Sequence, residues 1–406
     1  MSHILLRRSK ALVQIKLVSK EIQLRSITFP EGFHKDVYKA LFGTFRAVYV
    51  ALLSDVKQNA MKNYNHIFEK LMRMRQACCS ALLVPEERRT AAIKLWEELQ
   101  KRNADNQNPL TAEEGKTLLE KLKGTFTTEK DEDSLLPECA ICLMEMEMNE
   151  AVILKNCTHI FCHGCISRVF SGASSGCKAF CPLCRQPFEN SDMIQRSIAT
   201  ASIACHDELT ESKNSRMKTE KSGIEMSPKI AALLEAMKDM PIDEKGVIFS
   251  QFTSFLNLIG AAIEQAGHLF TRIDGSMATS CRTEAIRAFC SNDDDSPRFI
   301  LCSLHAAGTG INLTRGNHAF MMDCWWNVAI ENQAMDRIHR IGQTRKVRVI
   351  RFVMKNTIEE RMVILQEQKS LQGKASVEKL NPDEQRRTRM SNLQGLLMLD
   401  DDSNSE

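Results

Sequence analysis

Potential metal ligands recur in closely spaced pairs in the middle of the chain. In order, the pairs are Cys139/Cys142, Cys157/His159, Cys162/Cys165 and Cys181/Cys184. A gap of one or two residues lets both side chains of a pair reach the same metal ion, and a closed structural zinc site takes four such ligands. The pattern therefore predicts two zinc ions. Two such sites can hold together a segment that is too small to form an apolar core of its own.

The order of these pairs resembles the RING finger, a zinc domain with seven cysteines and one histidine. In RING fingers the pairs interleave. The resemblance implies one zinc held by Cys139, Cys142, Cys162 and Cys165, and a second held by Cys157, His159, Cys181 and Cys184. A redox Cys-x-x-Cys site is the competing interpretation, but three such pairs together with a Cys-x-His pair are much more specific for zinc.

RING ubiquitin ligases bind a ubiquitin-conjugating enzyme on a shallow apolar groove between the zinc loops. The resemblance places Ile141, Pro182 and Leu183 in that groove, and it places Arg185 where RING ligases hold ubiquitin against the conjugating enzyme. Many of these ligases carry a tryptophan where Val169 stands here, so this groove is expected to be apolar but less aromatic. The alternative is a zinc-stapled docking module that has no ligase activity.

Composition limits the cellular setting. The net charge of +3 does not by itself indicate nucleic acid. Of the 15 cysteines, eight are not among the predicted zinc ligands and show no disulfide spacing, which favours a reducing compartment, the cytosol or the nucleus. Arg7, Arg8 and Lys10 interrupt any secretory signal at the N-terminus. The longest uncharged stretch, residues 246–263, contains several polar residues and predicts no membrane span.

Hydrophobic patterning divides the rest of the chain. Residues 1–85 begin with short β-branched runs and continue as amphipathic helices. On the second helical stretch, Arg73 and Arg75 lie off the apolar stripe and are expected on a solvated face, with contact to phosphate as the alternative. Residues 86–135 are a charged linker, 136–190 the finger, 191–227 a second linker and 373–406 a tail. Residues 228–372 alternate buried strands with helices, which predicts an α/β domain with a parallel sheet.

Four motifs in that last domain resemble the second RecA-like lobe of Swi/Snf-type helicase-like ATPases. They are VIFSQF at 247–252, RIDGSM at 272–277, LCSLHAAGTGINL at 301–313 and QAMDRIHRIGQ at 333–343. A RING finger before this lobe resembles the branch that contains the helicase-like transcription factor and the yeast Rad-type DNA-repair translocases. The segment LMRMRQACC at 71–79 also resembles the stretch before the RING in that branch.

The resemblance assigns roles to individual residues. Arg337 and Arg340, three apart on a helix predicted over 330–341, are expected to share a face and to reach the γ-phosphate of ATP as arginine fingers. Gly308 and Gly310 allow a tight turn whose amides face phosphate. The DNA-binding residues are expected to be Ser250, Gln251, Ser303 and Trp325; for the pair Trp325-Trp326, packing of both rings in the core is the alternative. His305 replaces the family's usual lysine, and Val328 replaces its proline.

The sequence contains neither a Walker lysine loop nor an acidic magnesium box. Residues 1–85 are therefore expected to be only the trailing part of a first helicase lobe. We expect the C-terminal half of a nuclear, DNA-dependent ATPase with an embedded RING ligase, whose cofactors are two zinc ions and, in the full-length family, ATP and magnesium. Its partners would be a ubiquitin-conjugating enzyme, ubiquitin, and duplex DNA or chromatin, in repair or transcription. A non-catalytic adaptor, or a fragment whose ATPase needs the missing lobe, is the alternative.

Overall fold

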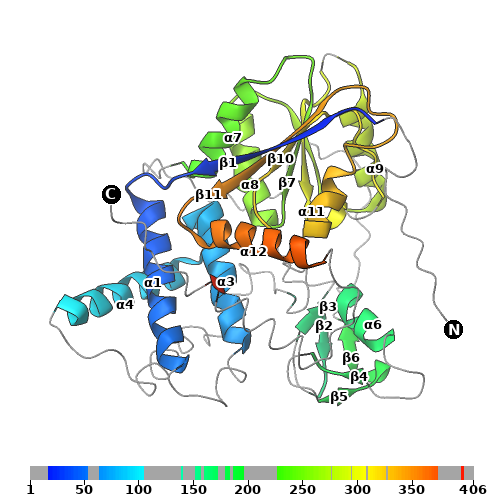
Figure 1. Ribbon diagram of the computed structural model, residues 1–406. Helices are drawn as coiled ribbons and strands as arrows, with labels where there is room; N and C mark the ends of the chain where they lie inside the picture. Colours follow the sequence, from blue (N-terminus) through cyan, green and yellow to red (C-terminus); the bar gives the residue numbers. More distant parts are fainter. Residues whose placement is uncertain are drawn as a thin grey trace. The chain divides into compact units, whose positions relative to one another are not determined.

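The computed structural model describes residues 17–53, 64–104, 139, 151–156, 160–171, 179–182, 186–195, 226–275, 277–293, 295–307, 310–325, 328–373 and 395–396. The chain divides into two compact units (Figure 1). The first, which we call the lobe unit, contains residues 1–38, 74–84 and 228–406. The second, the finger unit, contains residues 39–73 and 85–227. Along the sequence, the two segments of the finger unit therefore alternate with the three segments of the lobe unit.

A six-stranded sheet in the order β1-β11-β10-β7-β9-β8 forms the centre of the lobe unit. Every neighbouring pair of strands is parallel, which confirms the predicted α/β fold with a parallel sheet. The strands are β1 (Lys20–Ile27), β7 (Gly246–Ser250), β8 (Phe270–Ile273), β9 (Phe299–Ser303), β10 (His318–Met321) and β11 (Val347–Met354). All residues of β7, β9 and β10 are buried, as expected for strands covered on both faces.

Helices cover both faces of this sheet (Figure 1). They are α7 (Pro228–Lys238), α8 (Thr253–Gln265), α9 (Thr279–Cys290), α10 (Leu304–Ala307), α11 (Val328–Met335) and α12 (Ile358–Gly373). On one face, Val247 and Phe249 of β7 form a core with Phe289 of α9 and Met335 of α11. Figure 1 shows α7 and α8 on the opposite side from α9 and α11. Alternate strand residues therefore enter two different cores.

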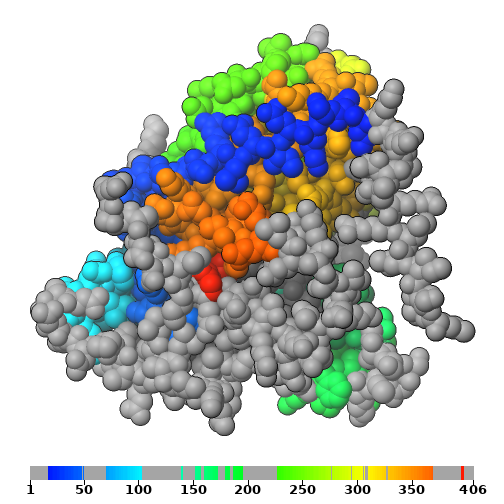
Figure 2. Space-filling model, in the orientation of Figure 1, coloured from blue at the N-terminus to red at the C-terminus, as the bar shows by residue number. Residues whose placement is uncertain are grey.

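Strand β1 extends the sheet beyond the range 228–372 expected from the sequence. It pairs with β11 over its whole length, from Lys20 opposite Val347 to Ile27 opposite Met354. This pairing satisfies the outer edge of β11, whose backbone groups would otherwise be open. Figure 2 shows β1 running along the surface of the lobe unit. Residues 20–27 are thus a structural part of the lobe unit's sheet.

Two helices belong partly to the lobe unit and partly to the finger unit. Helix α1 (Phe33–Leu53) begins in the lobe unit, and helix α3 (Tyr64–Cys79) ends in it. After the short 3-10 helix η1 (Ala81–Leu83), helix α4 (Glu86–Ala104) buries Ala92, Leu95 and Leu99. The first part of the segment expected as a linker is therefore a packed helix, because these three apolar residues recur at helical spacing.

The finger itself is built from short elements. These are β2 (Ala151–Leu154), β3 (Ile160–Cys162), α6 (His163–Ser171), β4 (Ala179–Phe180), β5 (Pro187–Phe188), the 3-10 helix η2 (Asn190–Asp192) and β6 (Met193–Gln195). They form an antiparallel sheet in the order β3-β2-β6 and a β4-β5 pair. Val152, Phe161, Ile166 and Phe188 are buried together with Cys139, Cys165 and Cys181. The expectation that this segment lacks an apolar core is wrong, because the cysteines themselves sit within one.

Residues 395 and 396 are the part of the expected tail, beyond α12, that the structure describes. Leu396 is fully buried, and its carbonyl accepts a hydrogen bond from Arg361 of α12 at 2.9 Å. Part of the expected tail therefore packs within the lobe unit.

Within the described ranges, none of the helices combines the length and the apolar character that crossing a membrane requires.

Helix α1 packs against α4 at Gly43, which leaves no room for a larger residue. A Cβ atom at Gly43 would lie 2.1 Å from the Trp96 ring. Gly43→Ala should destabilise this helix pair, because overpacking costs roughly 1–3 kcal/mol, more than the ~1 kcal/mol that alanine adds within a helix. Urea unfolding with amide exchange read on α4 measures the loss. Trp96→Leu in the Gly43→Ala background should recover part of it.

The matched control is Gly164→Ala in α6, where a Cβ atom would meet nothing within 4 Å. This change should leave stability equal or slightly higher. Equal stability of Gly43→Ala and wild type would contradict the packing described for α1 and α4.

Candidate functional site

Three cysteines meet at the first predicted zinc site. Cys162 ends β3, Cys165 lies in the first turn of α6, and Cys139 comes from the chain before β2. Their sulfur atoms all lie within 4.8 Å of one another. A tetrahedral zinc with Zn–S bonds of about 2.3 Å separates its sulfurs by about 3.8 Å, so these residues fit the ion. The fourth predicted ligand, Cys142, lies outside the described residues.

Of the four ligands predicted for the second zinc site, the structure describes one, Cys181. Cys181 is buried, at 1% exposure, and its amide donates to the Gln186 carbonyl at 2.9 Å, which closes the turn between β4 and β5. Within the described part of the chain, Cys181 stands outside the three-sulfur cluster, as the interleaved assignment expects. Cys157, His159 and Cys184 lie outside the described residues.

Arg168 supports the first site and was not predicted from the sequence. Its guanidinium donates to the Sγ atom of Cys165 at 3.8 Å and to the Gly164 carbonyl at 2.9 Å. A donor to a ligating sulfur favours the thiolate form that zinc binds. The sequence spacing could have indicated this contact. Arg168 follows Cys165 by three positions on α6, so the two side chains share a helix face.

The predicted docking groove is described in part. Pro182 is exposed, as a partner-binding residue must be. Val169, at the position where many ligases have tryptophan, packs against the finger core instead of projecting fully into solvent. Ile141, Leu183 and Arg185 lie outside the described residues, so their roles stay predictions.

In the lobe unit, the two predicted arginine fingers do not lie on a helix. Helix α11 ends at Met335. The following residues form turns, in which the Arg337 amide donates to Ala334 and the Gln343 amide donates to Arg340. The expectation of a helix to residue 341 is corrected here: turn bonds replace the helical pattern, and Gly342 has a positive φ of 100°. We call residues 336–343 the arginine loop. Arg337 is partly exposed and Arg340 exposed.

The structure brings the arginine loop together with residues 313–316, which follow the predicted phosphate-binding turn. The Leu313 amide donates to the Arg337 carbonyl at 3.1 Å. The Gln343 side chain donates to the Thr314 and Gly316 carbonyls at 3.0 and 2.8 Å. Gly310, at the start of this turn, is exposed and has a φ of 63°, where a side chain would be strained. Gly308 lies outside the described residues.

The four predicted DNA-binding residues are all buried. The exposed fractions are 0% for Ser250, 3% for Gln251, 3% for Ser303 and 2% for Trp325. The Ser250 hydroxyl donates to Asp323, and the Ser303 hydroxyl accepts from the Ala306 amide at 3.2 Å. The hydroxyls of Ser250 and Ser303 are thus engaged in internal bonds, whereas the buried side-chain amide of Gln251 has no hydrogen-bond partner among the described residues. Their role in DNA binding stays a prediction.

Trp325 is covered by Arg75 of α3. The guanidinium lies 5.5 Å from the Trp325 ring centre and 5.8 Å from that of Phe252. It also donates to the Cys324 carbonyl at 2.6 Å. The expectation that Arg73 and Arg75 form a solvated face is wrong, since they are 6% and 1% exposed. Helical periodicity identified the apolar stripe but could not show that the polar side of α3 is also buried.

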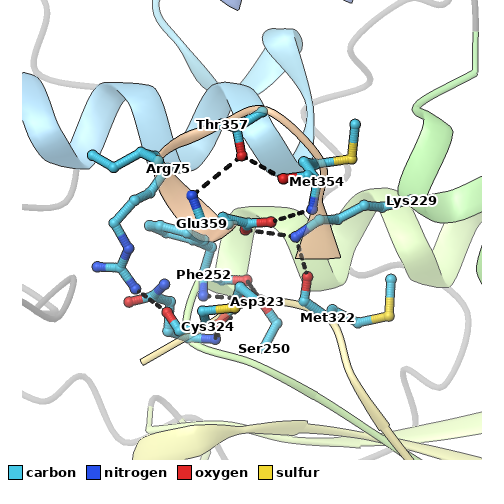
Figure 3. Close-up of polar contacts among 12 residues, drawn as sticks. Arg75, Lys229, Ser250, Phe252, Met322, Asp323, Cys324, Met354, Thr357 and Glu359 are labelled. Atoms are coloured by element: carbon cyan, nitrogen blue, oxygen red, sulfur yellow. Dashed lines mark hydrogen bonds and ion pairs between the residues drawn. The ribbon is translucent and has the colours of Figure 1, made fainter. Parts of the chain in front are cut away.

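Charged groups gather around these contacts (Figure 3). Lys229 of α7 bonds Glu359 of α12 at 2.6 Å, and both side chains are almost fully buried. Burial alone lowers the pKa of Lys229, but the negative charge of Glu359 opposes this and the pKa is raised. Burial raises the pKa of Asp323 to about 6, although the bond from Ser250 opposes this. Near neutral pH the Asp323 carboxylate can accept the bonds from Ser250 and the Gln251 amide.

Comparison with known proteins agrees with this geometry. Residues 137–185 match the Ring finger domain family, and residues 228–342 match the Helicase conserved C-terminal domain family. The C-terminal part of the Fun30 ATPase domain has a similar fold, with a TM-score of 0.50 and 18% identity over 94% of this chain and 98% of that one.

Similar curated proteins extend across most of the chain. The human (Homo sapiens) helicase-like transcription factor is 30% identical over 95% of this chain and 35% of its own length. DNA repair protein RAD5A of Arabidopsis thaliana is 34% identical over 82% of this chain and 30% of its own length. DNA repair protein RAD5 of Yarrowia lipolytica is 30% identical over 97% of this chain and 37% of its own length.

The chain thus spans about a third of the length of these relatives. Two domain families occur in it in the same order as the RING motif and the helicase motifs, and the relatives share both over most of the chain. This chain therefore combines a Ring finger domain with a helicase C-terminal domain, and over most of its length it is homologous to the helicase-like transcription factor and the RAD5 DNA repair proteins.

Proposed function

We propose that this chain is a RING-type ubiquitin ligase module built into the C-terminal part of a DNA-dependent ATPase, acting in the nucleus on chromatin or during DNA repair. The cluster formed by the sulfur atoms of Cys139, Cys162 and Cys165 carries the ligase proposal, because it matches the zinc geometry of a domain that fits the Ring finger family. The names of the relatives, which concern DNA repair and transcription, support the cellular setting.

The ligase acts by positioning in this proposal. Cysteines that coordinate zinc are deprotonated and occupied, so they are not available to carry ubiquitin as a thioester. The finger instead binds a conjugating enzyme that already carries ubiquitin, and it holds the thioester in an orientation suited to attack by a lysine. Ile141, Pro182 and Leu183 provide apolar contact, and Arg185 bonds both proteins. Zinc, when bound, fixes the two loops that carry these residues.

The second proposed activity, DNA-stimulated ATP hydrolysis, requires more than this chain. The bond between the Arg337 carbonyl and the Leu313 amide, three residues after Gly310, supports it, since arginine side chains and backbone amides from adjacent loops can surround a phosphate. ATP, when bound, would supply the phosphoanhydride bond that water cleaves in this reaction. The Walker lysine and acidic pair that would hold its β-phosphate and magnesium do not occur in the sequence.

The ligase proposal predicts separable effects of two substitutions. Ile141→Ala should weaken binding of the conjugating enzyme. Arg185→Ala should leave binding nearly unchanged and slow discharge of ubiquitin to free lysine, because only orientation is lost. Single-turnover discharge and binding titrations measure the two effects. Lys94→Ala, at an exposed position on α4, is the matched control, and chelation of zinc should abolish the stimulation.

Discharge at the rate of the conjugating enzyme alone, equal for wild type and both variants, would exclude the ligase. The chain would then be an adaptor in which the finger and the helicase lobe only bind partners.

The ATPase proposal predicts that this chain alone hydrolyses no ATP. Phosphate release with duplex DNA should be the same for wild type and for the Arg337→Ala, Arg340→Ala double variant, since the residues for magnesium and the β-phosphate are missing. A colorimetric phosphate assay gives the comparison. Faster release by the wild type would reveal a nucleotide site that the sequence motifs do not show.

A further inference from the structure

The chain leaves the sheet after β10 through a short buried stretch, residues 322–325, which we call the exit segment. Its four side chains are 0%, 3%, 2% and 2% exposed, in the order Met322, Asp323, Cys324 and Trp325. The segment has no regular secondary structure. Its polar groups therefore need partners outside a helix or a sheet ladder.

Those partners come from elements that are distant in sequence. The Met322 amide donates to the Phe249 carbonyl of β7, and the Met322 carbonyl accepts from Lys229 of α7 at 2.7 Å. The Asp323 carboxylate accepts from the Ser250 hydroxyl and the Gln251 amide. Figure 3 shows Lys229, Ser250 and Arg75 converging on this segment.

Arg75 supplies the contact at Cys324. Its guanidinium is the group that bonds the Cys324 carbonyl at 2.6 Å and stacks over the Trp325 ring. Burial lowers the pKa of Arg75, and the nearby Asp323 carboxylate opposes that shift. Because one planar group both bonds a carbonyl and covers a ring, it fixes the position and the direction of the segment.

The exit segment in turn is bonded to α11, the helix that precedes the arginine loop. The Trp325 amide donates to the Glu331 carboxylate of α11 at 2.7 Å, and Gln366 of α12 donates to both the Trp325 carbonyl and Glu331. Arg351 of β11 pairs with the same carboxylate at 2.8 Å. Helix α11 leads directly into the arginine loop, whose other end is held by Gln343.

We propose that Arg75 is a positioning residue for the arginine loop and that it acts through the exit segment and Glu331. Arg75 lies on α3, just before the residues 85–227 that carry the finger, and Lys229 lies just after them. Both ends of this long insertion are therefore fixed to the segment that sets the arginine loop. The functional meaning of the inference rests on the proposed role of Arg337 and Arg340.

Amide hydrogen exchange on the full chain tests the inference without any assay of activity. Arg75→Met keeps an apolar side chain over the rings but removes the donor to the Cys324 carbonyl. Exchange in residues 328–343 should become about tenfold faster, the effect of leaving one buried carbonyl unpaired, while β9 stays protected. Arg75→Lys, which keeps a positive donor, should recover most of the protection.

The matched control is Lys245→Met. Lys245 is also a buried cation that bonds carbonyls, those of Phe289 and Ser291, but it does not touch the exit segment. Its replacement should speed exchange around residues 289–298 and leave the arginine loop unchanged.

Two outcomes would overturn the proposal. The first is faster exchange across the whole lobe unit in Arg75→Met, equal in β9 and the arginine loop, which would show a contribution to stability only. The second is unchanged exchange in residues 328–343. Neither outcome depends on phosphate release, so failure of this inference is distinguishable from failure of the proposed ATPase role.

Discussion

The buried ion pair between Lys229 and Glu359 is the interaction on which the rest of the lobe unit depends. Placing two charges in an interior costs several kcal/mol per ion unless further hydrogen bonds satisfy them. Here the additional bonds exist: Lys229 also donates to the Met322 carbonyl, and Glu359 also accepts the Met354 amide at 3.0 Å. The pair thereby ties α7 and α12 to the ends of β10 and β11, at the edge of the sheet where the helicase motifs lie.

This arrangement relates the two modules of the chain. The sheet is completed by β1, and its exit segment is contacted by α3, so residues on both sides of the finger belong to the lobe. The finger is therefore an insertion within a domain and not an addition to its end. In a chain built in this way the finger can fold as a unit of its own, while the buried contacts of Arg75 and Lys229 hold the residues on either side of it.

Residue spacing predicted the zinc cluster and the parallel sheet, because ligand gaps and buried apolar runs are local signals. Contacts between distant segments gave no such signal. The pairing of β1 with β11, the burial of Arg75 over Trp325 and the burial of Ser250 against Asp323 each join segments far apart in sequence. The end of α11 at Met335 was also missed, since the bonds from Leu313 and Gln343 that favour the turn come from side chains and amides outside the helix.

A double-mutant cycle on the ion pair tests most directly whether it holds the lobe unit together. The free energy of unfolding, taken from the slowest-exchanging amides of β7, would be compared for wild type, Lys229→Met, Glu359→Gln and the double variant. Each single change should cost about 3–5 kcal/mol, because it leaves a buried charge without its partner. The double variant should lose clearly less than the sum of the two. Additive losses, or single losses below about 1 kcal/mol, the range of a surface pair, would contradict this account.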